Sequence, residues 1–398
     1  MANIRDYLRR KEKREKTGMW DFGQKILAHR LRVAVRVVLA VILIAVLAVT
    51  TYTQIKNQTY SGYMVISSVE RKLYNGTNVL PYEDGFITYS KDGISYTDAK
   101  GNAVWNQTYE MQSPMVKTGG KWVAVGDYNG HIIYNIDAKG TVKEIDTNLP
   151  IRTLTVAANG VVAAVLEDSG VTWINVYNPD GENPISMKTT MQKSGYPMSI
   201  SLSDNGKLMQ VAYLRAESGA MKSVVSFYNF DEVGQNYTDT MVSFYELAES
   251  VVPVVAFLNN QTAFCVADNQ LILFEGVEIP KNICQKWLSE EIRSVFYGDH
   301  YIALVFHNRE GNGKYRVDVY DTTGKVVMSK SFDLEYRDIF FANENMIIYN
   351  EAECVIVGLN GRERFNGELM EQTALLKPMG GKRYLAVTQE FLYVIEMK

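Results

Sequence analysis

The stretch NVLPYEDGFITYSKDGISYTDAKGNAVWNQTY, Asn78–Tyr109, contains four short segments in which apolar and polar residues alternate. Alternation with a period of two is typical of half-buried β-strands. Polar turns separate the segments, and the last turn, Asp98–Gly101, combines an aspartate with a glycine. Glycine readily adopts the positive φ of a tight turn, and an aspartate side chain bonds to the turn backbone. The stretch therefore predicts a four-stranded antiparallel sheet.

The same four-strand pattern recurs to the end of the chain. Its turn glycines return about every 43 residues, at Gly101, Gly140, Gly181, Gly234, Gly276, Gly324 and Gly361. A period of about 40–45 residues with four strands per repeat is typical of a β-propeller blade. No long helical period follows residue 54. The exception is Cys284–Ser294, where a short helical insertion is an alternative to a strand.

The two ends of the repeat region complement each other. Seven units precede an eighth, Thr373–Lys398, which has only three strands, and a spare strand stands before the first unit at Ser61–Leu73. Joining the spare strand to the eighth unit completes a blade and removes an exposed sheet edge. We therefore predict an all-β, eight-bladed β-propeller over residues 61–398. Seven blades are the alternative if residues 195–250 divide differently.

Val33–Tyr52 is an apolar run of 20 residues, VAVRVVLAVILIAVLAVTTY, in which Arg36 is the only charge. As a helix, a run of this length extends about 30 Å, the thickness of a hydrocarbon core. The run is apolar on all sides, which disfavours a buried helix of a soluble domain. We predict a transmembrane signal-anchor helix over residues 33–53. A cleaved signal peptide is the alternative, although the preceding segment is long and no clean cleavage site follows.

Charge on the two sides of this run predicts its orientation. Residues 1–36 contain 11 Lys and Arg against 4 Asp and Glu, whereas only Lys56 follows the run closely. The positive-inside rule then leaves the N-terminus in the cytoplasm of a single-pass cell-membrane protein. The net charge of −4 argues against a nucleic-acid partner. The predicted regions are a basic cytoplasmic tail (1–32), the membrane helix (33–53), a short linker (54–60) and an extracytoplasmic propeller (61–398).

The tail has a weak amphipathic pattern, formed by Ile4, Leu8, Met19, Trp20, Phe22, Ile26, Leu27 and Leu31. One interpretation places the tail on anionic lipid, with Trp20 and Phe22 at the interface. The alternative, which we favour, is that the tail serves only as a topology signal. Gly18 and Gly23 are expected to interrupt a helix in this region.

Residues that carry catalytic chemistry are few and separated. No metal-binding spacing links the four histidines, His29, His131, His300 and His307. Three cysteines give no disulfide framework, at Cys265, Cys284 and Cys354. Cys265 and Cys354 are expected to be buried thiols, with a bridge between them as the alternative. No P-loop, dinucleotide or nucleophile-elbow motif occurs, so the sequence predicts no catalytic residue, no cofactor and no metal.

Several other groups are interpreted as structural. Carboxylate pairs are expected in solvated turns rather than as a catalytic pair, at Glu167–Asp168, Asp231–Glu232, Glu290–Glu291 and Glu351–Glu353. The segment Asn178–Asn183, NPDGEN, lacks the twelve-residue calcium-loop pattern and is expected to be an ordinary turn. Tryptophans are expected to pack between blades rather than to form sugar-stacking platforms, at Trp105, Trp122, Trp173 and Trp287. Asn-x-Thr sequences are no more frequent than chance predicts, at Asn57, Asn75, Asn106, Asn236 and Asn260.

Ile94–Tyr109 resembles the repeats of quinoprotein-type and outer-membrane-assembly-type propellers, in which an aspartate–glycine turn is followed by a tryptophan. Asp98, Gly101 and Trp105 match this pattern. Most later units keep the turn without the tryptophan, as at Asp137, Gly140, Asp321 and Gly324. The whole arrangement of basic tail, single span and propeller resembles membrane-anchored propeller proteins of unknown function in anaerobic Gram-positive bacteria. That resemblance implies fold and localisation rather than an activity.

These observations favour a non-catalytic binding scaffold in the cell envelope. The helix would tether the propeller, whose loops are expected to bind an envelope protein or a glycan. One alternative is a tethered quinoprotein-like or glycan-active enzyme, and another is a sensor of an exterior ligand that signals through the basic tail.

Overall fold

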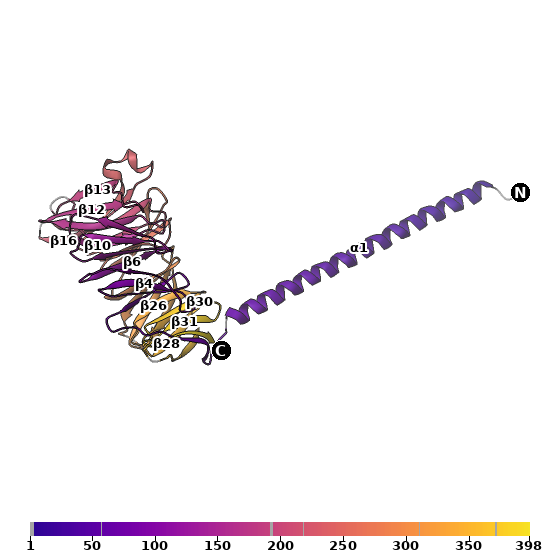
Figure 1. Ribbon diagram of the computed structural model, residues 1–398. Coiled ribbons are helices and arrows are strands. Elements are labelled where there is room, and N and C mark those ends of the chain that lie inside the picture. The colour runs from indigo at the N-terminus through magenta and orange to yellow at the C-terminus, as the bar shows by residue number, and fades with distance from the viewer. Residues whose placement is uncertain (1–3, 57, 192–193, 218, 310, 371) are drawn as a thin grey trace. The chain divides into compact units, whose positions relative to one another are not determined.

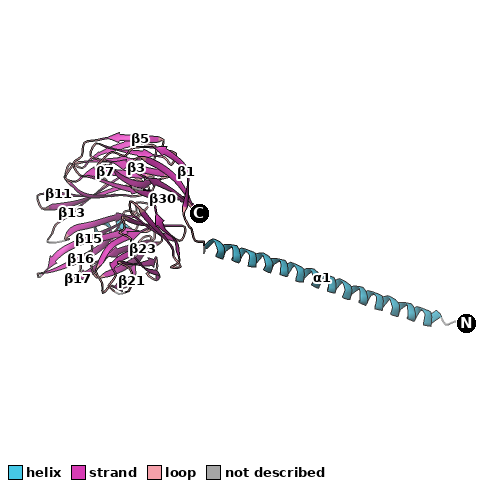
Figure 2. Ribbon diagram, turned by 90° about the horizontal axis from the view of Figure 1, so that it is seen from below, coloured by secondary structure: helices cyan, strands magenta, loops and turns pink. Residues whose placement is uncertain are grey.

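The computed structural model describes residues 4–56, 58–191, 194–217, 219–309, 311–370 and 372–398. It separates into two compact units, Met1–Gln58 and Thr59–Lys398. The first unit is a single helix, α1 (Ile4–Lys56), and the second is built of strands (Figures 1 and 2).

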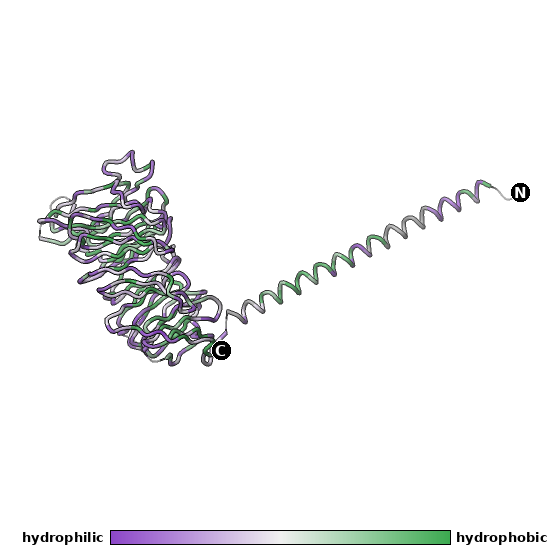
Figure 3. Tube along the Cα trace, in the orientation of Figure 1, coloured by the Kyte–Doolittle hydropathy of each residue, from purple (hydrophilic) through white to green (hydrophobic). Residues whose placement is uncertain are grey.

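Within α1, His29–Thr51 is long and apolar enough to cross a membrane, with a mean hydropathy of 2.9. Figure 3 shows the change along the helix from hydrophilic to hydrophobic residues. The expected interruption at Gly18 and Gly23 is wrong, because α1 is continuous through both. One glycine costs a helix only about 1 kcal/mol, which strong helix formers around it can offset. The side chains of Trp20 and Phe22 lie outside the described residues, as does Asn57.

Eight four-stranded antiparallel sheets form the blades of the second unit. Blade 1 consists of β2 (Asn78–Tyr82), β3 (Gly85–Tyr89), β4 (Gly93–Thr97) and β5 (Ala103–Thr108). Blade 2 consists of β6 (Pro114–Gly119), β7 (Trp122–Asp127), β8 (Ile132–Ile136) and β9 (Val142–Asp146). Blade 3 consists of β10 (Ile151–Val156), β11 (Val162–Asp168), β12 (Val171–Tyr177) and β13 (Ile185–Thr189). Blade 4 consists of β14 (Tyr196–Leu202), β15 (Leu208–Glu217), β16 (Ala220–Asn229) and β17 (Met241–Ala248).

The remaining blades follow the same order. Blade 5 consists of β18 (Val254–Phe257), β19 (Thr262–Val266), β20 (Gln270–Glu275) and β21 (Lys281–Trp287). Blade 6 consists of β22 (Ile292–Tyr297), β23 (Tyr301–His307), β24 (Tyr315–Asp321) and β25 (Val326–Phe332). Blade 7 consists of β26 (Asp338–Ala342), β27 (Asn345–Tyr349), β28 (Glu353–Gly358) and β29 (Glu363–Glu368). Blade 8 consists of β30 (Leu375–Gly380), β31 (Arg383–Val387), β32 (Phe391–Met397) and β1 (Tyr63–Glu70).

The prediction of eight blades is confirmed, and residues 195–250 form one blade rather than an irregular segment. Its polar loop contains two short 3₁₀ turns, η1 (Gly234–Asn236) and η2 (Thr238–Thr240). The helical alternative at Cys284–Ser294 is wrong, because β21 and β22 occupy most of that segment. β21 is held as a strand by backbone pairing with β20.

In each blade the first strand is innermost, since first strands of neighbouring blades, such as β6 and β10, contact each other. β1 closes the ring by pairing with β32, from Tyr63 opposite Met397 to Glu70 opposite Phe391. Both ends of the propeller chain therefore meet on one face, which we call the proximal face. It carries the turns between first and second strands and between third and fourth strands. The distal face carries the other turns and the connections between blades.

Eight apolar cores hold the blades together, one in each interface between neighbours. The alternation of each strand sends side chains to both neighbours. In β11, for example, Ala163 and Val165 face blade 4, whereas Ala164 and Leu166 face blade 2. Burying apolar surface contributes about 25 cal/mol per Å². A blade therefore needs a neighbour on each side, and a closed ring supplies both.

Aspartate–glycine turns dock several blades on their predecessors. Gly140 of blade 2 has a φ of +81°, and a Cβ at this position would lie 2.5 Å from the Cβ of Trp105 in blade 1. Gly324 packs in the same way against Cys284. Glycine is thus required here both for its backbone conformation and for the close approach of two blades.

Asp137 caps the turn that contains Gly140. Its Oδ1 accepts hydrogen bonds from the N–H groups of Lys139 (2.8 Å) and Thr141 (2.8 Å). Partial burial alone would raise the pKa of Asp137, but the hydrogen bonds from Thr141 and Lys139 outweigh it and lower the pKa below 3.8. A carboxylate with a lowered pKa stabilises the fold above its unfolded value and loses that contribution as the pH falls.

We predict that Asp137→Ala lowers the free energy of unfolding at pH 7 by about 1 kcal/mol, because two turn N–H groups lose their acceptor. The difference from the wild type should narrow as the pH falls below 3.8. Urea unfolding of the wild type and the Asp137→Ala protein at several pH values measures this difference in the free energy of unfolding. Asp137→Asn, which keeps an oxygen acceptor, is the control and should lose less. A difference that stays constant down to acid pH would contradict the role assigned to the carboxylate.

Candidate functional site

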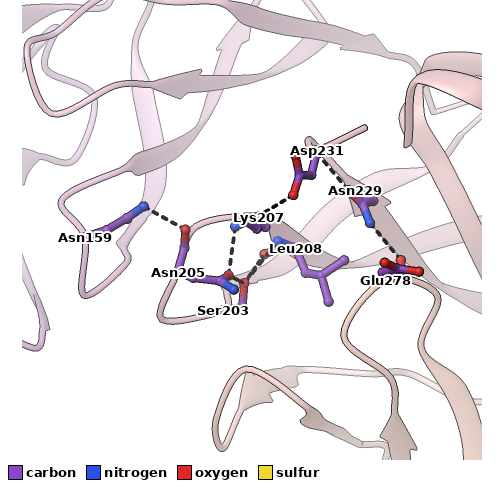
Figure 4. A network of polar contacts seen from close by, with 8 residues as sticks. All are labelled: Asn159, Ser203, Asn205, Lys207, Leu208, Asn229, Asp231 and Glu278. Carbon is purple, nitrogen blue, oxygen red and sulfur yellow. Dashed lines mark hydrogen bonds and ion pairs between the residues drawn. The ribbon is translucent and has the colours of Figure 1, made fainter. Parts of the chain in front are cut away.

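On the proximal face, turns of neighbouring blades are bonded to one another. Asn159 Nδ2 donates to the carbonyl of Asn205 (2.7 Å), and the N–H of Asn205 donates to Asn260 Oδ1 (2.8 Å). These bonds join the inner turns of blades 3, 4 and 5. Figure 4 shows the bond between Asn159 and Asn205 and the extension of the network to Lys207, which forms an ion pair with Asp231.

Comparable contacts occur elsewhere on this face. Tyr82 Oη donates to the carbonyl of Lys121 (2.7 Å) between blades 1 and 2. Asn343 Nδ2 donates to the carbonyl of Gly381 (3.4 Å) between blades 7 and 8. Polar groups of the proximal turns are therefore engaged in holding the blades in place, which leaves fewer of them to recognise a partner.

On the distal face, Tyr128, Arg152, Glu167 and Tyr196 form a compact cluster, which we call the Tyr–Arg cluster. Arg152 Nε donates to Glu167 Oε2 (2.9 Å), and its guanidinium carbon lies 5.5 Å from the centre of the Tyr128 ring. Tyr196 Oη donates to the same carboxylate oxygen (3.4 Å). Burial, and then the charge of Glu167, raise the pKa of Tyr196. Its hydroxyl therefore remains a donor at neutral pH.

The Tyr–Arg cluster has the composition of a protein-binding surface. Tyrosine and arginine contribute most to binding at protein interfaces. Tyr128 is 46% exposed, and the carboxylate of Glu167 holds Arg152 in one orientation. Less side-chain entropy would then be lost on binding. The repeat pattern does not single out Arg152, although a charge within the otherwise uncharged strand IRTLTV was a signal for it.

The histidines are spread over the molecule. His300 lies in a proximal turn of blade 6, whereas His307 ends β23 on the distal face, 2.8 Å from Arg293 Nη1. His131 is exposed on the distal face of blade 2, and His29 belongs to α1. Within the described part of the chain, no group of three or more His, Cys, Asp or Glu is placed to hold a metal ion.

The cysteines are free thiols in the structure. Cys265 and Cys354 are buried in blades 5 and 7, with blade 6 between them, so the alternative of a bridge is wrong. Burial raises the pKa of both thiols. They remain protonated at neutral pH, and a protonated thiol is a poor nucleophile.

The four carboxylate pairs lie in different parts of the ring and do not converge. One member of each pair forms an ion pair, namely Glu167 with Arg152 (2.9 Å), Asp231 with Lys207, Glu290 with Arg316 (2.8 Å) and Glu351 with Arg337 (3.4 Å). The Asn178–Asn183 segment is a hydrogen-bonded turn, in which the N–H of Asn178 donates to the carbonyl of Glu182 (2.8 Å).

The tryptophans divide into two groups. Trp105, Trp122 and Trp173 pack in the cores between blades, as expected. For Trp287 that expectation is wrong, because this side chain is 68% exposed on the outermost strand of blade 5. An outermost strand has only one paired neighbour, so part of its surface faces solvent.

The interface between blades 8 and 1, which we call the seam, has the smallest apolar core of the eight, formed by Phe86, Leu375, Leu385, Val387 and Leu392. In blade 8, Leu375, Val387 and Leu392 stand at the distal ends of their strands. Phe86 of blade 1 stands instead near the proximal end of β3. Blade 1 is therefore displaced along the propeller axis, toward the distal side of blade 8.

Two further contacts show the same displacement. Gly101, in a proximal turn of blade 1, packs against Val69 near the distal end of β1. The same glycine accepts a hydrogen bond at its carbonyl from Arg71 Nη1 (3.4 Å), and Arg71 follows the distal end of β1. The displacement leaves the distal half of blade 1 uncovered on the side that faces blade 8.

Hydroxyl and amide side chains occupy this uncovered surface. Thr88, Ser95 and Asn106 stand next to one another on β3, β4 and β5. Blade 2 has Val125 and Tyr134 at the positions equivalent to Thr88 and Ser95. The connector Arg71–Thr77 forms the other wall of a groove of about 320 Å³, which we call the seam groove.

A second cleft lies on the other side of the same connector. It has a volume of about 480 Å³ and is lined by Lys72, Leu73, Asn75, Arg337, Glu351, Gln372, Gln389 and Glu390. Two clefts and the Tyr–Arg cluster thus share the distal face. The repeat pattern could not locate the clefts, since they arise from the offset between two blades at the closure.

These features define a closed eight-bladed β-propeller with two clefts and the Tyr–Arg cluster on the face away from the chain ends. The chain belongs to the family of unknown function DUF5711, whose model matches residues 56–397. No curated protein sequence matches the chain.

Solved structures of propellers are similar in fold. BamB from Moraxella catarrhalis is 13% identical with a TM-score of 0.52, covering 84% of this chain and 100% of that one. AztD from Citrobacter koseri is 7% identical with a TM-score of 0.50, covering 79% and 95%. Sqt1 from Chaetomium thermophilum, bound to the N-terminus of ribosomal protein L10, is 11% identical with a TM-score of 0.50, covering 85% and 100%. At this identity the similarity concerns the fold alone.

Lys377 of β30 crosses the seam and binds the inner turn of blade 1. Its Nζ donates to the carbonyls of Tyr82 (3.1 Å), Glu83 and Gly85 (3.0 Å). Burial lowers the pKa of Lys377. This side chain compensates in part for the small apolar core of the seam.

We predict that Lys377→Met lowers the free energy of unfolding by about 2 kcal/mol, because three carbonyls lose a charged donor. Chemical denaturation of the wild type and the variant measures the loss. Lys117→Met, at an exposed position of β6, is the matched control and should change stability little. Equal stability of the two variants would show that Lys377 does not hold the seam.

Proposed function

We propose that the chain is a non-catalytic binding scaffold of the cell envelope. In this proposal α1 anchors the chain in the cell membrane, and the basic tail lies in the cytoplasm. The propeller lies on the outer side of the membrane and binds an envelope protein there. The contrast between the two faces of the propeller carries the proposal. Proximal turns bind one another, whereas the distal face presents the Tyr–Arg cluster to solvent.

The propeller chain begins and ends on the proximal face, where the N–H of Ser61 donates to the carbonyl of Lys398 (2.8 Å). Neither end of the propeller chain therefore occupies the distal face. No contact among the described residues favours the enzymatic alternative or the sensor alternative over the scaffold.

The proposal predicts cross-linking of a protein partner from the distal face in cells that make the full chain. A photoreactive phenylalanine derivative at position 128 should give one dominant adduct, identified by mass spectrometry. The same probe at position 139, in a proximal turn where Lys139 is exposed, is the matched control and should not give that adduct.

Arg152→Ala should then weaken binding of the identified partner about 30-fold, the effect of removing one main contact of an interface. Surface plasmon resonance with the full chain in nanodiscs measures the affinity. Equal adducts from positions 128 and 139, or unchanged affinity of the Arg152→Ala protein, would overturn the assignment of the distal face.

The orientation of the chain is tested separately. An epitope tag at the C-terminus should be digested by protease added outside spheroplasts, and a tag at the N-terminus should be protected until the membrane is opened. The charge difference across the apolar run is the physical reason. Protection of the C-terminal tag in closed spheroplasts would contradict an extracytoplasmic propeller.

A further inference from the structure

The seam groove is unlike the interior of the other blade interfaces. Thr88, Ser95 and Asn106 are cross-strand neighbours, so their side chains form one row across three strands. In the neighbouring interface the positions equivalent to Thr88 and Ser95 are Val125 and Tyr134, which belong to an apolar core. Hydroxyl and amide groups on a sheet face beside a groove are therefore a local feature of blade 1.

The row offers donors and acceptors together. Thr88 Oγ1 and Ser95 Oγ are 2.8 Å apart and share one hydrogen bond. Since each hydroxyl carries one donor and two acceptor sites, the pair retains both kinds of group for a ligand. Asn106 and Gln107, which also line the groove, add amide groups that donate and accept. A ligand with many hydroxyl groups has the complementary chemistry.

Net charge at the groove is low. Arg71, Lys72 and Asp92 line it, two cations and one carboxylate. The guanidinium of Arg71 is directed to the carbonyl of Gly101 (3.4 Å) and to the ring of Phe86 (5.9 Å). An anionic ligand would therefore meet a net charge of only one positive group here.

The walls supply apolar surface for a ring. Leu73 and Tyr74 belong to the connector that borders the groove, and Tyr74 is 81% exposed. The flat ring of a tyrosine can cover the C–H face of a pyranose while its hydroxyl stays in water. An extended peptide would find fewer contacts, because β3 and β4 pair on both sides and only the outer edge of β5 keeps unpaired backbone groups.

We propose that the seam groove binds a short neutral saccharide. The hydroxyl and amide row contacts the sugar hydroxyls, and Tyr74 packs on one sugar ring. The volume of about 320 Å³ is at the lower end of small-ligand pockets, which suits one or two sugar rings of a longer chain. This site is separate from the Tyr–Arg cluster, and it does not depend on the protein partner proposed above.

The test uses the full-length chain in nanodiscs and three neutral probes, chitotetraose, cellotetraose and maltotetraose. Saturation-transfer NMR and calorimetry should show saturable binding of at least one probe. The double variant Thr88→Val/Ser95→Ala removes two hydroxyls at nearly constant volume and should weaken that binding about 10- to 30-fold. Tyr74→Ala, at an exposed position that is not required for packing, should weaken it independently.

Thr118→Val is the matched control, since Thr118 is an exposed strand threonine in blade 2. It should leave saccharide binding unchanged, and unfolding midpoints should show that all variants are folded. Failure of all three probes to bind would overturn the proposal. So would binding of a probe that neither the double variant nor Tyr74→Ala weakens, or binding of an anionic tetragalacturonate in place of the neutral probes.

Discussion

The antiparallel pairing of β1 with β32 joins two strands from opposite ends of the propeller chain, and the rest of the structure depends on it. Each blade has two apolar faces that only neighbouring blades can cover. If the ring were open, the terminal blades would expose a core to water and a strand edge to other chains. Closure through β1 removes both, and the eight separate cores then support one another around the ring.

Closure also concentrates irregularity at one place. Seven interfaces join blades that are consecutive in the chain, and a short turn or connector sets their height. Blades 8 and 1 are joined through β1 and its connector, and β1 is held in blade 8 by pairing with β32 rather than by a turn. Blade 1 is displaced there, and the apolar core is correspondingly small. Lys377, which reaches three carbonyls across the seam, and the exposed row at Thr88 and Ser95 both result from that displacement.

The two faces of the propeller differ in how their polar side chains are engaged. On the proximal face, side chains of the inner turns bond to neighbouring turns, as Asn159 does with Asn205. On the distal face, Arg152, Tyr128 and Glu167 contact one another and remain partly open to solvent. This difference supports the proposed binding role of the distal face.

The amino-acid sequence by itself determined the repeat, the number of blades, the closing strand and the apolar segment of α1. These features are local: a turn such as Asp98–Gly101 requires glycine at a positive φ, and strand alternation is readable residue by residue. Only the tertiary structure decided that Trp287 is exposed and that a groove lies beside Thr88. It also decided that Arg152, Tyr128 and Tyr196 lie in one cluster around Glu167. These depend on how one blade packs against another, because the height and twist of a blade are set by contacts between residues far apart in the chain.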